Sequence, residues 1–166
     1  RVGVVFSQNK AVCQALSSMA YFSSPSTQSQ YAFNNILRDM DFLNKYKGEN
    51  QLRLRKNYQI WTQFLQSLNL DFIMAEAGFF SWFSLASFMK EKTFEEERRL
   101  WGLILEECQV LFAGGWEQNS LEPGWFRCCF TALPPEELEV ACNRLRRFLL
   151  QTSEQVSESI IPNRSQ

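Results

Sequence analysis

The chain has 166 residues, of which 45% are hydrophobic and 14% aromatic, enough to bury one substantial core. Its 17 basic and 18 acidic residues leave a formal net charge of -1, which provides no field to attract nucleic acid or an anionic membrane. No apolar run approaches the roughly 18 to 20 residues that cross a bilayer. We therefore expect neither nucleic acid nor a membrane as a partner. The first residue is not methionine, so we expect a fragment of a longer protein.

Five cysteines and the absence of histidine restrict the chemistry of the chain. Adjacent strand residues point to opposite faces, so a disulfide between Cys128 and Cys129 is unfavourable. The chain contains no Cys-x-x-Cys pair and no histidine for a zinc site. We therefore expect reduced cysteines, no metal and a cytoplasmic location. The lack of histidine also removes the usual base for a serine or cysteine nucleophile.

The first part of the chain predicts one strand followed by helices. Residues 2–7 form a short valine-rich apolar run, typical of a strand covered on both faces. Asn9 is a favourable cap for a helix that continues to about Phe22. Apolar residues return at helical spacing over residues 30–37 and over residues 41–68, where Gly48 is a candidate bend. Helices as long as the last one often connect domains, so we place a boundary near its start.

The rest of the chain predicts a small sheet with helices. Two β-like runs, residues 70–76 and 78–85, suggest a hairpin, and a capping box of Thr93 and Glu96 begins a helix over residues 93–109. Two more strands are predicted on either side of a glycine-rich loop. A last helix begins with proline near residue 134, and a polar tail follows Gln151. This order of elements predicts an α/β or α+β unit.

Arg127 requires an explanation of its own. It follows a Glu-Pro-Gly turn and lies between aromatic and strand-forming residues. A half-buried guanidinium without an anion costs several kcal/mol, roughly, in lost hydration. The residues leave three alternatives: the anion belongs to a ligand, it is an internal acid such as Glu122, or Arg127 lies on an exposed strand face.

Several segments together resemble one enzyme family. The sequence "EPGWFRCCF" at residues 122–130, followed by "EELEVACNRLRRFL", is similar to the C-terminal segment of the 1-aminocyclopropane-1-carboxylate synthases. Supporting similarities are "RVGVVFSQN" at the start of the chain, "SSPSTQSQ", "AGFFSWF" and "TFEEERRLW". These synthases are fold-type I enzymes that use pyridoxal 5'-phosphate and are related to the class I/II aminotransferases.

The resemblance implies an α/β fold and a division of the chain into four parts. Residues 1–40 correspond to the last strand and helices of the cofactor-binding large domain, and residues 41–69 to a long connecting helix. Residues 70–151 correspond to the small C-terminal domain, in which a small sheet carries helices. Residues 152–166 form a polar tail.

The resemblance also implies roles for two arginines. Arg127 aligns with the arginine that binds the α-carboxylate of the amino-acid substrate, and Arg1 with the one that contacts the cofactor phosphate. The cofactor lysine precedes this segment in the family. The resemblance therefore implies that the chain carries no catalytic residue and is inactive alone, and that the intact enzyme is a homodimer.

The implied reaction converts S-adenosylmethionine to 1-aminocyclopropane-1-carboxylate and methylthioadenosine. The alternatives are a class I/II aminotransferase and a noncatalytic homologue. They stay open because "AGGWEQNS" at residues 113–120 departs from the Pro-Gly-Ser turn and Ser-Phe pair of the family. We expect Trp116 and Glu117 in this segment to alter substrate specificity.

Overall fold

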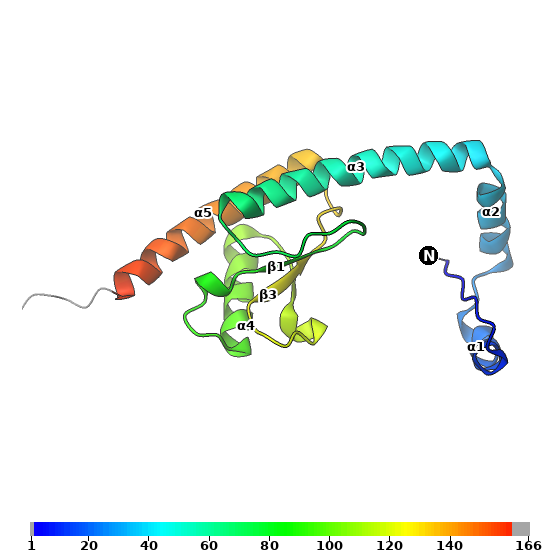
Figure 1. Ribbon diagram of the computed structural model, residues 1–166, viewed down its shortest axis with the longest axis horizontal. Coiled ribbons are helices and arrows are strands. Elements are labelled where there is room, and N and C mark those ends of the chain that lie inside the picture. Colours follow the sequence, from blue (N-terminus) through cyan, green and yellow to red (C-terminus); the bar gives the residue numbers. More distant parts are fainter. Residues whose placement is uncertain (1, 161–166) are drawn as a thin grey trace, which may run out of the picture. The chain divides into compact units, whose positions relative to one another are not determined.

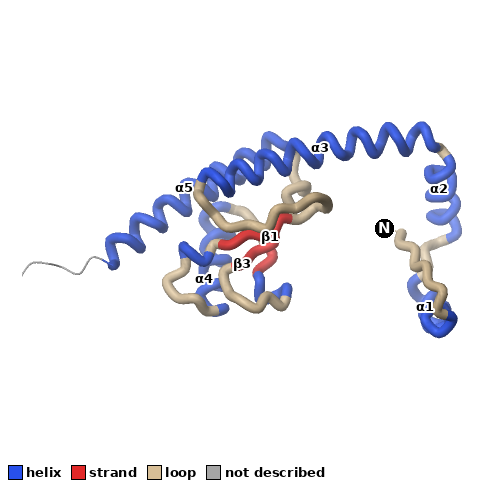
Figure 2. The backbone as a smooth tube through the Cα atoms, in the orientation of Figure 1, coloured by secondary structure: helices blue, strands red, loops and turns tan. Residues whose placement is uncertain are grey.

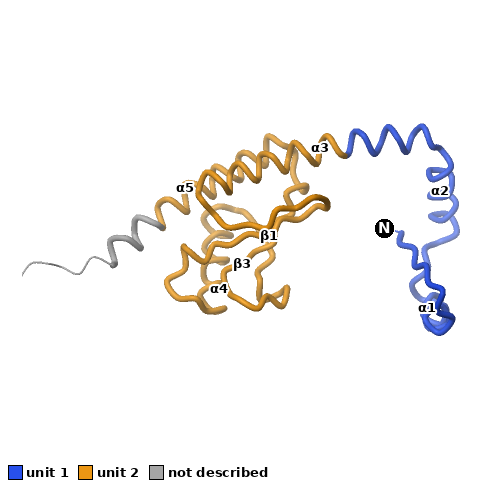
Figure 3. The backbone as a smooth tube through the Cα atoms, viewed as in Figure 1, with its two compact units in different colours: residues 1–50 blue, residues 51–166 orange. Residues whose placement is uncertain are grey.

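The computed structural model (Figure 1) describes the backbone of residues 2–160 and the side chains of residues 2–152. Most of the described elements are helices, and the strands are short (Figure 2). The chain divides into two compact units, Arg1–Asn50 and Gln51–Gln166, coloured separately in Figure 3. Among the described residues, no helix is both long and apolar enough to span a bilayer.

Unit 1 contains the predicted N-terminal helices. Helix α1 covers Lys10–Ser23 and α2 covers Thr27–Arg38, and α3 begins at Met40 and ends at Ser67 in unit 2. The Asn9 side chain caps α1 by accepting a 3.0 Å hydrogen bond from the Ala11 N–H, as the sequence predicts. Helix α3 is assigned as one continuous helix through Gly48.

The predicted strand at residues 2–7 is wrong for this structure, because these residues form no strand. A strand needs neighbours that pair with its backbone N–H and C=O groups. The described part of unit 1 supplies only helices and connecting segments. The expected burial is also missing, since the side chains of Val4 and Phe6 are 85% and 87% exposed.

Unit 2 is built on a three-stranded sheet with the order β1-β3-β2. Strands β1 (Ser81–Ser84) and β2 (Ala113–Gly114) both pair antiparallel with the central strand β3 (Trp125–Cys128). The second run of the predicted hairpin, residues 78–85, contains β1, and the first run, residues 70–76, pairs with it only at the bridge between Phe72 and Phe83. The small sheet predicted from the sequence is therefore present, and its pairing is antiparallel throughout.

Three helices cover one face of this sheet. They are the C-terminal half of α3, α4 (Phe94–Leu103) with the π-helical turn Ile104–Cys108 that follows it, and α5 (Pro135–Ile160). Their apolar side chains form one core with the inner face of the sheet. That core includes Trp61, Phe64, Leu65, Phe83, Leu100, Ile104, Cys108, Phe126, Cys128, Leu138, Cys142, Leu145 and Leu149.

Helices α3 and α5 lie side by side and run in the same direction (Figure 1). Buried Asn57 of α3 donates to the Phe130 and Leu133 carbonyls at 3.0 and 2.9 Å, which fastens the connection between β3 and α5. Arg146 of α5 donates to the Ser67 hydroxyl at 2.7 Å. Helix α5 continues to Ile160, so the chain stays helical beyond Gln151, where the sequence predicts a tail.

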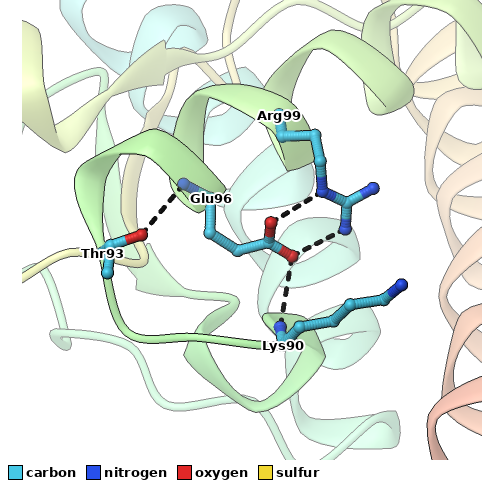
Figure 4. A network of polar contacts seen from close by, with 4 residues as sticks. All are labelled: Lys90, Thr93, Glu96 and Arg99. Carbon is cyan, nitrogen blue, oxygen red and sulfur yellow. Dashed lines mark hydrogen bonds and ion pairs between the residues drawn. The ribbon is translucent and has the colours of Figure 1, made fainter. Parts of the chain in front are cut away.

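The start of α4 shows half of the predicted capping box (Figure 4). The Thr93 hydroxyl accepts a 3.2 Å hydrogen bond from the Glu96 N–H, but the Glu96 carboxylate accepts none from the Thr93 N–H. It instead accepts from the Lys90 N–H and from the guanidinium of Arg99. The pKa of Glu96 is lowered, chiefly by the hydrogen bonds from Arg99.

Candidate functional site

Arg127 lies on the central strand, on the sheet face opposite the core. Along β3 the side chains alternate, with Phe126 and Cys128 buried and Trp125 and Arg127 half-buried. This alternation follows from the two-residue period of a strand. The register places Arg127 between Trp82 of β1 and Ala113 of β2. The backbone of Arg127 is therefore paired with a strand on each side.

Among the described residues, the guanidinium of Arg127 contacts the side chains of Gln118 and Phe80. Its Nη1 donates a 2.8 Å hydrogen bond to Oε1 of Gln118, and its Cζ lies 4.7 Å from the centroid of the Phe80 ring. Among the described residues, no carboxylate lies within ion-pair distance of Arg127. The internal ion pair with Glu122, one of the sequence alternatives, is therefore not formed. The guanidinium therefore faces a neutral amide and an aromatic ring.

Two tryptophans form a flat surface beside this cation. Trp82 lies directly opposite Arg127 in the register, and its ring is nearly parallel to that of Trp125, at 8° with centroids 6.0 Å apart. Both tryptophans are half-buried. Such stacked aromatic faces offer apolar area with little conformational freedom to lose. The sheet face thus combines one cation with an apolar surface.

The loop between β2 and β3 carries the amide that contacts Arg127. Gln118 is the last residue of a short 3-10 helix, Gly115–Gln118, and the loop returns to β3 through Gly124. Gly124 has a φ of +93°, and a Cβ there would lie 2.8 Å from the Cβ of Ala86. Only glycine suits both the backbone conformation and this close approach. The glycine of the Glu-Pro-Gly turn is therefore required on steric grounds.

A buried carboxylate joins the two ends of this loop. Glu97 of α4 has a relative exposure of 0%. Its Oε1 accepts from the Trp116 N–H at 3.2 Å, and its Oε2 accepts from the Gly124 N–H at 2.6 Å. Among the described residues, no cationic side chain forms an ion pair with it. Both side-chain hydrogen bonds of Glu97 therefore come from backbone N–H groups of the β2–β3 loop.

Trp116 packs against α4 and does not form the loop's hydrogen bond to Arg127, which comes from Gln118. The Trp116 ring meets Trp101 edge to face with centroids 5.8 Å apart, and the Arg98 Cζ lies 5.6 Å from its centroid. The ring also covers Gly114, where a Cβ would lie 1.9 Å from it. The effect of Trp116 and Glu117 on specificity stays a prediction.

The other sequence expectations concern the cofactor, metals and thiols. Arg1 lies outside the described residues, so its contact with a cofactor phosphate stays a prediction. Within the described part, no group of three or more metal-binding side chains is placed to hold an ion. All five cysteines are free. Burial raises the pKa of Cys108 and of Cys142 to about 11, and it raises that of Cys128 further.

Residues 1–145 match the family model for aminotransferase class I and II. This chain belongs to the aminotransferase class I and II family. Among its relatives is 1-aminocyclopropane-1-carboxylate synthase 6 of Oryza sativa subsp. japonica, 36% identical over 146 residues, or 88% of this chain and 27% of the relative. The 1-aminocyclopropane-1-carboxylate synthase of Glycine max is 31% identical over 99% of this chain and 33% of its own length. The chain thus spans only about a third of the curated relatives it matches.

Solved aminotransferases share the fold of this family member. An aromatic aminotransferase from Pyrococcus horikoshii OT3 superimposes with a TM-score of 0.70 at 18% identity, over 87% of this chain and 37% of that one. A Thermus thermophilus aspartate aminotransferase mutant gives a TM-score of 0.68 at 21% identity, over 83% of this chain and 36% of that one. These similarities confirm the predicted fold type over part of those enzymes.

Two residues close to Arg127 or to its loop, Gln118 and Glu97, escaped the sequence prediction. Gln118 ends a short 3-10 helix in the connection between β2 and β3, and no periodic pattern relates it to Arg127. Glu97 did carry a usable pattern, because it lies three residues before Leu100 and seven before Ile104, on the apolar stripe of α4. A glutamate on such a stripe predicts a buried carboxylate with specific partners.

Proposed function

We propose that this chain forms the C-terminal third of a pyridoxal-phosphate enzyme, called the parent protein below, that converts S-adenosylmethionine to 1-aminocyclopropane-1-carboxylate and methylthioadenosine. Membership of the aminotransferase family supports the cofactor class. Relatives named as 1-aminocyclopropane-1-carboxylate synthases, at 31% to 36% identity, support this reaction. On this proposal residues 1–40 belong to the large domain and residues 70–151 to the small domain.

One observation about the site carries the proposal. Arg127 is a half-buried cation on the central strand, and its described polar partner is the neutral amide of Gln118. A guanidinium has five N–H donors, and its fork matches the two oxygens of a carboxylate. We assign Arg127 to the α-carboxylate of the amino-acid substrate. The anion that this half-buried guanidinium requires is then supplied by the ligand.

The contacts of Arg127 define how a carboxylate approaches it. Phe80 lies over one face of the guanidinium, and Gln118 occupies an Nη1 donor at one edge. The remaining N–H groups point outward in the guanidinium plane, so a carboxylate binds edge-on with two parallel hydrogen bonds. Trp82, opposite Arg127 in the register, and the parallel ring of Trp125 add apolar surface to the same face of the sheet.

The cofactor lies mainly outside this chain. Pyridoxal phosphate, when bound, supplies the electron sink that makes the substrate α-proton acidic. Arg1 is proposed to contact its phosphate, and the cofactor lysine is expected upstream of Arg1. We therefore propose that the isolated chain is inactive, and that the parent protein acts as a homodimer in the cytoplasm.

The test uses the parent protein mixed with pyridoxal phosphate and S-adenosylmethionine. The α-proton leaves, a bond forms between Cα and Cγ, and the Cγ–S bond breaks, so methylthioadenosine is the product to measure. Wild type is expected to release it. Arg127→Ala should raise KM about 10- to 150-fold, because it removes a charge-assisted bidentate contact worth roughly 1.5 to 3 kcal/mol.

Other outcomes identify the alternative functions. Amino-group transfer to a keto acid without methylthioadenosine release would establish a class I/II aminotransferase that uses the same arginine. Failure to bind pyridoxal phosphate at all would indicate a noncatalytic homologue. Normal release by Arg127→Ala, with unchanged KM, would contradict the assigned role of Arg127.

A further inference from the structure

We infer that Glu97 is a positioning residue, which fixes the loop of residues 115–124 and thereby sets the geometry in which Arg127 meets a carboxylate. The inference rests on the proposed function of Arg127. The Glu97 side chain is fully buried, and no cationic side chain among the described residues forms an ion pair with it. A buried carboxylate is unfavourable unless hydrogen bonds replace its lost hydration. Its partners therefore indicate what this charge does.

Both partners of Glu97 are backbone N–H groups of the same loop. One belongs to Trp116, near the start of the loop, and the other to Gly124, at its end. A carboxylate accepts hydrogen bonds on both oxygens at once, and bonds to an ionised acceptor are stronger than neutral ones. Glu97 therefore joins two points of the loop that lie eight positions apart in the sequence and closes it against α4.

The two fixed points lie close in the sequence to Gln118 and to Arg127, the residue that would bind the ligand. Trp116 is two residues before Gln118, and Gly124 is three residues before Arg127. The loop is also closed internally, because the Ser120 N–H donates to the Gly115 carbonyl at 3.0 Å. Movement of either fixed point would shift the 2.8 Å contact between Gln118 and Arg127. Glu97 thus acts on the carboxylate site without touching it.

The surrounding residues leave little freedom for the Glu97 contact to rearrange. A Cβ on Gly115 would lie 2.8 Å from the Trp125 carbonyl oxygen and 3.1 Å from Glu97 Oε1. The Gly124 carbonyl in turn accepts from the Leu85 N–H at 2.8 Å, which ties the turn to the end of β1. The Glu97 carboxylate therefore packs closely against Gly115 and binds Gly124, the two ends of the loop.

Glu97→Gln is the sharpest test, because this substitution keeps the size of the side chain and replaces one carboxylate oxygen with an NH2 group. Its amide has one acceptor oxygen, and its NH2 group would face the second backbone N–H, donor against donor. We expect Glu97→Gln in the parent protein to raise KM for the amino-acid substrate about tenfold, the loss expected for one unsatisfied N–H. The kcat should change less than about twofold, because no reacting atom is touched. Glu95→Gln, on the exposed side of α4, is the matched control and should change neither value.

A double-mutant cycle separates positioning from general destabilisation. If Glu97 acts through Arg127, then Glu97→Gln should add less than about twofold to KM when Arg127 is already alanine. A full tenfold addition would overturn the inference. If Arg127→Ala alone leaves KM unchanged, the proposed function of Arg127 fails and this inference falls with it. If Arg127→Ala raises KM and Glu97→Gln does not, only the positioning role of Glu97 is wrong.

A second variant and a second readout cover the case in which Glu97→Gln does not fold. Glu97→Asp keeps the charge but shortens the reach by one methylene, so it should raise KM in the same direction. In the 166-residue chain, amide hydrogen exchange at Gly124 should accelerate at least about tenfold in either variant. The Phe83 amide in β1 is the internal reference. Unchanged exchange at Gly124 would show that Glu97 does not hold the loop.

Discussion

Arg127 Nη1 donates a 2.8 Å hydrogen bond to Gln118 Oε1, and this neutral acceptor leaves the charge of the guanidinium uncompensated among the described residues. A carboxylate in the same place would form an ion pair and reduce the attraction for an incoming anion. The choice of an amide at position 118 is thus compatible with ligand binding. It also holds one edge of the guanidinium fork in a defined orientation.

Gln118→Glu should weaken carboxylate binding by the parent protein. The new carboxylate would lie at the present Oε1 position, pair with Arg127 and compete with the substrate. We expect KM to rise at least about tenfold, since a charge-assisted contact is worth roughly 1.5 to 3 kcal/mol. Asn119→Asp adds the same charge one residue further along the loop and should change KM less than about threefold. Equal effects of the two variants would show that only net charge matters.

Gly124→Ala should destabilise the 166-residue chain. The residue has a φ of +93°, and an added Cβ would lie 2.8 Å from Ala86 Cβ and 2.9 Å from its Cα. Positive φ and the contact together should lower the free energy of unfolding by about 1 to 3 kcal/mol. Urea unfolding followed by tryptophan fluorescence measures this change.

Gly102→Ala is the matched control for that substitution. Gly102 lies in α4, and a Cβ there would meet nothing within 4 Å. Alanine should therefore stabilise the helix by about 0.5 to 1 kcal/mol. If Gly124→Ala were equally harmless, the tight approach of the turn to Ala86 would be wrong.

The sequence predicted the regular elements well because local rules determine them. Asn9 before a helix, proline at the start of α5 and the apolar periods of α3 and α5 each act within a few residues. The strand at residues 2–7 failed for the opposite reason. A strand depends on distant pairing partners, and an apolar run does not specify them.

The candidate site was predicted only in part, for a similar reason. Arg127 stood out because a cation among strand-forming residues is unusual, and the family resemblance gave it a role. Its neighbours Gln118 and Phe80 come from separate loops, and their meeting depends on how the sheet brings them together. Glu97 lies in the first turn of α4 together with Glu95 and Glu96, where the positive end of the helix dipole favours any acidic residue. Its burial becomes apparent only when its position is compared with Leu100 and Ile104.

Thiol labelling should divide the cysteines by burial. Cys13 and Cys129 are exposed, whereas Cys108, Cys128 and Cys142 are buried. Burial raises the pKa of Cys108 and Cys142 to about 11, so few thiolates exist at pH 8, and the thiolate is the reactive form. Iodoacetamide followed by peptide mass analysis should modify Cys13 and Cys129 first. Equal labelling of the neighbours Cys128 and Cys129 would show that the core face of β3 is open.

Glu96 should make the stability of the 166-residue chain depend on pH. Hydrogen bonds from Arg99 lower the pKa of Glu96 in the folded chain, so its contribution is present above its ordinary pKa and is lost as pH falls through the lowered value. Glu96→Gln should therefore reduce the free energy of unfolding by about 0.5 to 1 kcal/mol at pH 7, and the difference should shrink steadily below about pH 4. Urea unfolding at a series of pH values measures this, with Glu95→Gln as the exposed control on the same turn. A deficit that stays constant across the series would mean that Glu96 stabilises α4 without using its charge.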